Sequence, residues 1–143
     1  MKKILFFLFL SLSAFLNANE KNNKLVDLLH SFGNNGEYAQ MDSVYNLIIH
    51  EDHYKQDKLY ALNITLDYAR FLNQKGDSER ANTLLTQIRK SAIALEKFPE
   101  NTIAHQLQEI AAIATYEIAY GQWQNNQLPA ARETAEEAVS QLE

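Results

Sequence analysis

The feature that most constrains the fold is a helix–turn–helix pattern that occurs more than once along the chain. Residues 74–81 (QKGDSERA) and residues 124–131 (QNNQLPAA) each join two long segments whose apolar residues follow helical spacing. Repeated units of this kind bury their apolar faces by stacking on their neighbours, so recurring helical hairpins predict a stacked array. Such arrays present surfaces for binding rather than catalytic chemistry.

The same spacing predicts about six helices, arranged as three antiparallel hairpins. The first hairpin combines a helix that starts at residue 24 and ends at the turn 33–36 with a helix over residues 37–50. The second covers residues 57–74 and 78–97, and the third covers residues 102–125 and 129–142. No stretch sustains the period-two alternation of a strand, so the predicted fold class is all-α.

The first 18 residues have the features of a Sec signal peptide. Lys2 and Lys3 precede an apolar run over residues 4–16, and Ala18 is a small residue at which a signal peptidase would cut. The run is shorter than the roughly 20 apolar residues that a membrane-spanning helix needs. We therefore expect residues 1–18 to be removed. Residues 19–143 are then expected to form one helical domain, periplasmic or secreted, without a stable membrane anchor.

The composition argues against several classes of function. The chain has 13 Lys and Arg against 18 Asp and Glu, and removal of the two leader lysines makes the exported part still more acidic, so nucleic acid is not an expected partner. The absence of cysteine excludes disulfides and thiolate catalysis. The sequence has neither a Gly-x-Ser-x-Gly turn nor a phosphate-binding glycine loop, so we expect neither enzymatic activity nor a cofactor.

His50 and His53, which flank Glu51 and Asp52, are the candidate ligands of a metal site. The two histidines are three residues apart, whereas the zinc-protease helix motif places them four apart, and the sequence suggests no third ligand. We therefore interpret residues 50–53 as a solvated linker between the first two hairpins and predict no metal site.

The helix predicted over residues 102–125 has two apolar faces. At 100° per residue, Ile110, Ala114 and Gly121 fall within an arc of about 80° with the other aliphatic positions. An aromatic set lies on nearly the opposite side. This set contains Tyr116, Tyr120 and Trp123. A helix with two such faces lies between layers, or between a layer and a ligand.

These hairpins resemble the tetratricopeptide repeat (TPR), a helix–turn–helix unit in which small residues let paired helices approach and larger residues fill the gaps between them. The second hairpin matches best, with small, large, turn-glycine, small and large residues at the spacing of the motif: Ala69, Leu72, Gly76, Ala81 and Leu85. The resemblance implies a TPR-like α-solenoid of stacked hairpins. The alternative is an irregular helical bundle with the same pattern.

The resemblance further implies that the first helix of each hairpin lines a concave groove for a polypeptide. Its groove positions, carried over one by one, include six candidate partner-binding residues: Asn63, Arg70, Asn73, Tyr116, Tyr120 and Trp123. Asparagine can bond a peptide backbone, arginine can pair with a carboxylate, and aromatic rings supply rigid contact area. Alternatively, the aromatic rings pack in the core against neighbouring helices.

The sequence thus predicts an exported, non-enzymatic interaction or scaffold module that binds a protein or peptide partner and can assemble into a larger complex. Two alternatives stay open. One is a compact helical bundle that binds a small ligand or metal. The other is an inhibitor or immunity partner of an exported enzyme, with which an acidic surface is compatible.

Overall fold

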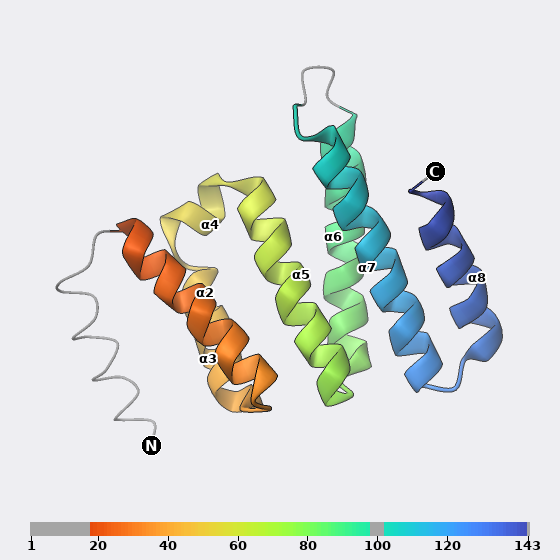
Figure 1. The fold of residues 1–143 in the computed structure, drawn as a ribbon, viewed down its shortest axis with the longest axis horizontal. Coiled ribbons are helices and arrows are strands. Elements are labelled where there is room, and N and C mark those ends of the chain that lie inside the picture. The colour runs from red at the N-terminus through yellow and green to blue at the C-terminus, as the bar shows by residue number, and fades with distance from the viewer. Residues whose placement is uncertain (1–17, 98–101, 143) are drawn as a thin grey trace. The chain divides into compact units, whose positions relative to one another are not determined.

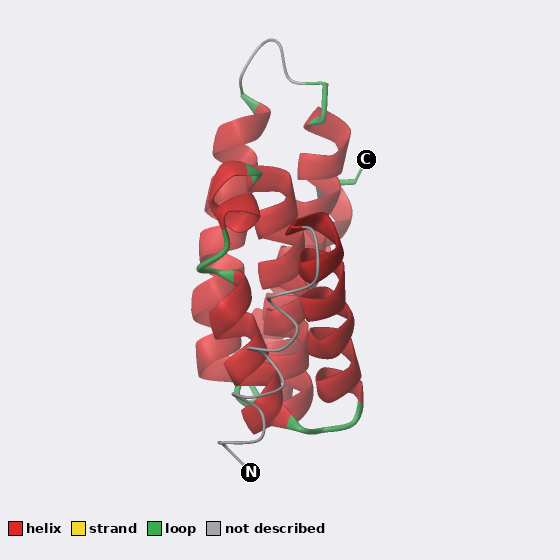
Figure 2. Ribbon diagram, turned by 90° about the vertical axis from the view of Figure 1, so that its left-hand side faces the viewer, coloured by secondary structure: helices red, strands yellow, loops and turns green. Residues whose placement is uncertain are grey.

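All regular structure in the described part of the chain is helical. The structure is a computed structural model that describes residues 18–97 and 102–142. Within these ranges there is no strand (Figure 2), which confirms the predicted all-α class. No helix in these ranges combines the length and the apolar character that crossing a membrane requires. Residues 1–17, nearly all of the predicted signal peptide, lie outside the described residues.

The described residues form two compact units, with the boundary between Lys55 and Gln56. The first unit contains α2 (Ala18–Asn34) and α3 (Tyr38–Ile48), which pack on each other. Their interface buries aliphatic and thioether side chains: Leu25, Leu29, Met41 and Val44. The turn between them has Gly36 at a φ of 73°, which a residue with a side chain rarely adopts.

The segment that follows α3 is solvated, as predicted for residues 50–53, and in addition contains a short helix. This helix, α4 (Asp52–Gln56), has an acidic residue in its first turn and basic residues in its last turn, an arrangement that complements the helix dipole. Just before it, Glu51 accepts a 2.8 Å hydrogen bond from Lys21 of α2. The polar composition of residues 50–56 therefore reflects a solvated helix rather than an irregular connection.

The second unit consists of α5 (Lys58–Lys75), α6 (Ser78–Glu96), α7 (Ala104–Gln124) and α8 (Leu128–Ser140) (Figure 1). These bounds confirm the predicted helices to within a few residues. Helix α5 begins where the Asp57 carboxylate accepts a 2.9 Å hydrogen bond from the Tyr60 amide. It ends at Gly76, whose φ of 87° breaks the helix and starts the turn into α6.

Helix α7 is the centre of this unit, because it contacts α5, α6 and α8. The core around it contains leucine and isoleucine side chains with at most 2% of their surface exposed: Leu72, Leu85, Ile88 and Leu107. At Gly121 the helix comes so close to the α5–α6 turn that a Cβ atom would lie 3.2 Å from Asn73 Oδ1 and 3.4 Å from Ser78 Cβ. Glycine permits this approach.

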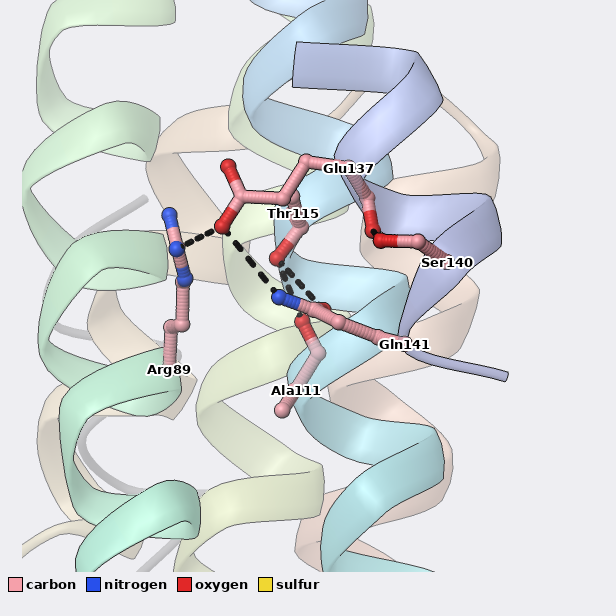
Figure 3. A network of polar contacts seen from close by, with 6 residues as sticks. All are labelled: Arg89, Ala111, Thr115, Glu137, Ser140 and Gln141. Carbon is pink, nitrogen blue, oxygen red and sulfur yellow. Dashed lines mark hydrogen bonds and ion pairs between the residues drawn. The ribbon is translucent and has the colours of Figure 1, made fainter. Parts of the chain in front are cut away.

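A polar network joins the last helix to the rest of the unit (Figure 3). The Oγ1 atom of the fully buried Thr115 lies 2.8 Å from the Ala111 carbonyl oxygen and 3.1 Å from Gln141 Oε1. Arg89 of α6 forms an ion pair with Glu137 of α8. These contacts fix the C-terminal half of α8 against both α6 and α7.

Candidate functional site: an aromatic face on α7

Helix α7 carries exposed aromatic rings, which we call the aromatic face: Tyr116, Tyr120 and Trp123. Tyr116 is 57% exposed and Trp123 is 58% exposed, whereas Tyr120 is partly covered. The rings of Tyr120 and Trp123 are stacked, with centroids 5.8 Å apart. Aromatic side chains that remain on a surface are enriched among the residues that dominate protein–protein binding energies.

The sequence of α7 explains why these rings are at the surface. Alanines occupy much of the circumference that faces α5, α6 and α8: Ala111, Ala112, Ala114 and Ala119, all buried. Small side chains let three neighbouring helices pack closely, so the bulky rings are left to the remaining arc of the helix. The aromatic face is therefore held by a helix that is fixed on its other sides.

Beside this face, three side chains connect α5 to α7. Arg70 donates through Nε to Glu117 Oε1 at 3.1 Å. Asn73 donates through Nδ2 to the Glu117 backbone oxygen at 2.9 Å and to Glu117 Oε2 at 3.2 Å. Glu117 is 8% exposed, so these donors compensate a carboxylate that has lost most of its water.

The structure places the three predicted residues of α5 in different environments. Asn63 is exposed, and its Nδ2 donates to the Leu59 carbonyl oxygen of its own helix at 3.0 Å. The Arg70 side chain is half exposed and engages Glu117. Asn73 is only 1% exposed, so it does not open onto the groove that the resemblance to the TPR implies. The reason is the close approach of α7 at Gly121, which covers the end of α5.

Glu117 was not among the residues singled out from the sequence, although a signal was present. On a helical wheel it lies about 20° from Ile110, at the edge of the buried stripe. A carboxylate at the edge of an apolar stripe needs a cationic or hydrogen-bonding partner on the facing helix. In the structure, Arg70 and Asn73 of α5 supply these donors.

The His50 and His53 pair is not part of a metal-binding cluster in the described residues. No group of three or more histidine, cysteine, aspartate or glutamate side chains is gathered there in a way that could hold a metal ion. Both histidines are exposed, and His50 Nδ1 lies 2.6 Å from the Asn46 carbonyl oxygen.

Comparisons with known proteins add no relative. The chain matches no model of a known protein family, no curated protein and no solved structure.

Proposed function

We propose that this chain is an exported, non-enzymatic module of the TPR type that binds a protein or peptide partner. Binding uses the surface of α5 and α7, the first helices of the second and third hairpins. The chain needs no cofactor for this binding. Through the surface of α5 and α7 it joins a larger complex.

The packing of the second unit supports the resemblance to the TPR. Helix α5 contacts both α6, its partner in the hairpin, and α7, the first helix of the next hairpin. The small and large positions of the motif in the second hairpin have no exposed surface: Ala69, Leu72, Ala81 and Leu85. Contact between successive first helices is what a groove along them requires.

The observation that carries the proposal is the exposure of the aromatic face. Tyr116 and Trp123 each keep more than half of their surface in water, although α7 is otherwise packed against three helices. Burial of large apolar rings is favourable, and a partner supplies the burial that this fold does not. Asn63 and Arg70 on α5 offer hydrogen-bonding groups for the rim of the same contact.

The test compares two double variants in crosslinking capture from the cell that exports the protein. Replacement of Tyr120 and Trp123 by alanine is expected to abolish capture of the partner that the native chain retains. The matched control is Leu128→Ala with Val139→Ala, which removes exposed apolar surface from α8 instead. Equal loss of capture in both variants would contradict binding on α7.

Thermal unfolding of the same variants separates binding from folding. Because Trp123 is 58% exposed, the double substitution on α7 is expected to lower the melting temperature by only a few degrees, roughly 1 kcal/mol. A large fall in melting temperature would instead assign the rings to the core. Export is tested separately, by N-terminal sequencing of the periplasmic protein, which is expected to begin at residue 19.

A further inference from the structure

A polar pocket lies away from the aromatic face, at the end of the second unit where α5 turns into α6 and α7 ends. It has a volume of about 210 Å³. Its lining includes polar side chains from all three helices: Asn73, Ser78, Glu79, Asn82, Glu117 and Gln122. An apolar cavity of about 150 Å³ already holds benzene, so this pocket has room for the head of an amino-acid side chain.

Two hydrogen-bond acceptors at this pocket are unsatisfied. Within the described residues, the buried side-chain oxygens without a donor are Asn73 Oδ1 and Gln122 Oε1, and both residues line the pocket. A buried acceptor without a donor destabilises a fold, so two of them at one place call for an explanation. A ligand that supplies N–H donors would provide one.

The side-chain amides of Asn73 and Gln122 differ in their freedom to turn toward a ligand. Asn73 is held in place, because its Nδ2 already donates to the Glu117 backbone and carboxylate. Its Oδ1 faces Gly121, because a Cβ atom built at Gly121 would lie 3.2 Å from it. Gln122 has a terminal torsion with a broad, shallow energy profile, so its amide oxygen can turn toward a bound donor at little cost.

The charges around the pocket favour a cation. No lysine, arginine or histidine is among the residues that line it in the described chain, whereas Glu79 and Glu117 are. Arg70 compensates Glu117 from the α5 side, which leaves the Glu79 carboxylate to meet a bound cation.

We infer that this pocket binds an organic cation that donates N–H hydrogen bonds, either a guanidinium or a primary ammonium group. The ligand presents its donors to Asn73 and Gln122 and its charge to Glu79. Such a group belongs either to a small free molecule or to an arginine or lysine side chain of a polypeptide. The site is distinct from the aromatic face, because Trp123 lies about 100° around α7 from Gln122.

The test is titration of the ¹⁵N-labelled full chain with methylguanidinium, followed through the side-chain amide signals of Asn73 and Gln122 in NMR spectra. Saturable shifts are expected, with a dissociation constant on the order of 1–10 mM for so small a ligand. Methylurea, a neutral molecule of similar shape, is expected to bind at least about tenfold more weakly. Shifts that do not saturate, or equal binding of methylurea, would overturn the inference and leave only water in the pocket.

Variants at Gln122 test the site without disturbing the helix, since glutamine, methionine and glutamate have similar helix propensities. Gln122→Met is expected to weaken binding about tenfold and Gln122→Glu to strengthen it several-fold. Gln106→Glu is the matched control, because it adds the same charge to an exposed position of the same helix. Unchanged binding by Gln122→Met, or an equal gain in the control, would refute the assignment.

A second titration, with the peptide acetyl-Gly-Arg-Gly-amide, distinguishes a free cation from the side chain of a polypeptide. Binding at least about tenfold tighter than methylguanidinium assigns the pocket to a polypeptide side chain, and equal binding assigns it to a free cation. The variant with Tyr120 and Trp123 replaced by alanine is expected to bind methylguanidinium as the native chain does. A result that refutes partner binding at the aromatic face would thus be distinguishable from one that refutes cation binding in the pocket.

Discussion

Replacement of Asn73 by alanine tests whether this side chain stabilises the core rather than lying on the open surface of the predicted groove. Asn63 provides a matched control, since it is an exposed asparagine on the same helix. The two substitutions carry the same gain in helix propensity, so the difference between them isolates the buried contacts. We expect Asn73→Ala to destabilise the second unit and Asn63→Ala to leave its stability within about 0.5 kcal/mol of the native value.

The magnitude follows from the two hydrogen bonds that Asn73 Nδ2 donates to Glu117. Loss of the bond to the carboxylate costs about 2 kcal/mol and loss of the bond to the backbone oxygen about 1 kcal/mol. The void left by the carboxamide adds about 1 kcal/mol. Removal of the unsatisfied Oδ1 atom offsets about 1–2 kcal/mol of this loss, so the net loss is about 2–3 kcal/mol.

The assay is urea and thermal unfolding followed by circular dichroism and by tryptophan fluorescence. Trp123 is the single tryptophan of the chain and lies on α7, so its fluorescence reports the second unit. A loss of 2 kcal/mol corresponds to a fall in melting temperature of roughly 8–16 °C for a unit of this size. Equal stability of Asn73→Ala and Asn63→Ala would refute the buried network and return Asn73 to the open surface of the predicted groove.

Three further substitutions or additions have defined outcomes. Gly121→Ala is expected to lower stability, even though alanine favours a helix by about 1 kcal/mol, because the new Cβ would lie 3.2 Å from Asn73 Oδ1 and Asn73 is fixed by Glu117. Denaturant unfolding decides the sign, and a stabilised variant would contradict the close approach. Thr115→Val removes the hydroxyl near Gln141 without changing shape, so amide hydrogen exchange in the last turn of α8 is expected to accelerate while α7 stays protected. Zinc added to the tag-free protein is expected to be lost on dialysis, and retention of one zinc per chain by elemental analysis would show that His50 and His53 acquire further ligands.

The helices of the second unit could be predicted from the sequence because local signals specify them. Asp57 and Gly76 act as start and stop through their own capping geometry, and both can be identified without knowledge of the fold. The aromatic face likewise follows from the angular separation of Tyr116 and Trp123 from the aliphatic stripe. Local spacing also identified residues 78–97 and 102–125 as helices.

The burial of Asn73 could not be predicted, because it depends on a helix almost 50 residues further along the chain. The resemblance assigns position 73 to a groove, but the approach of α7 at Gly121 determines whether that position is open. The pocket at Gln122 has the same origin, since its lining comes from three helices and the following loop. The short helix α4 was missed because five polar residues carry no apolar periodicity.

The central position of α7 determines the order in which the helices of the second unit unfold locally. Release of α5 or of α8 alone would leave α7 packed on the remaining helices, so its amides are expected to exchange last. The rings it displays would then keep their mutual arrangement while peripheral helices fray. A partner would meet a rigid, preorganised surface and would lose little conformational entropy in binding it.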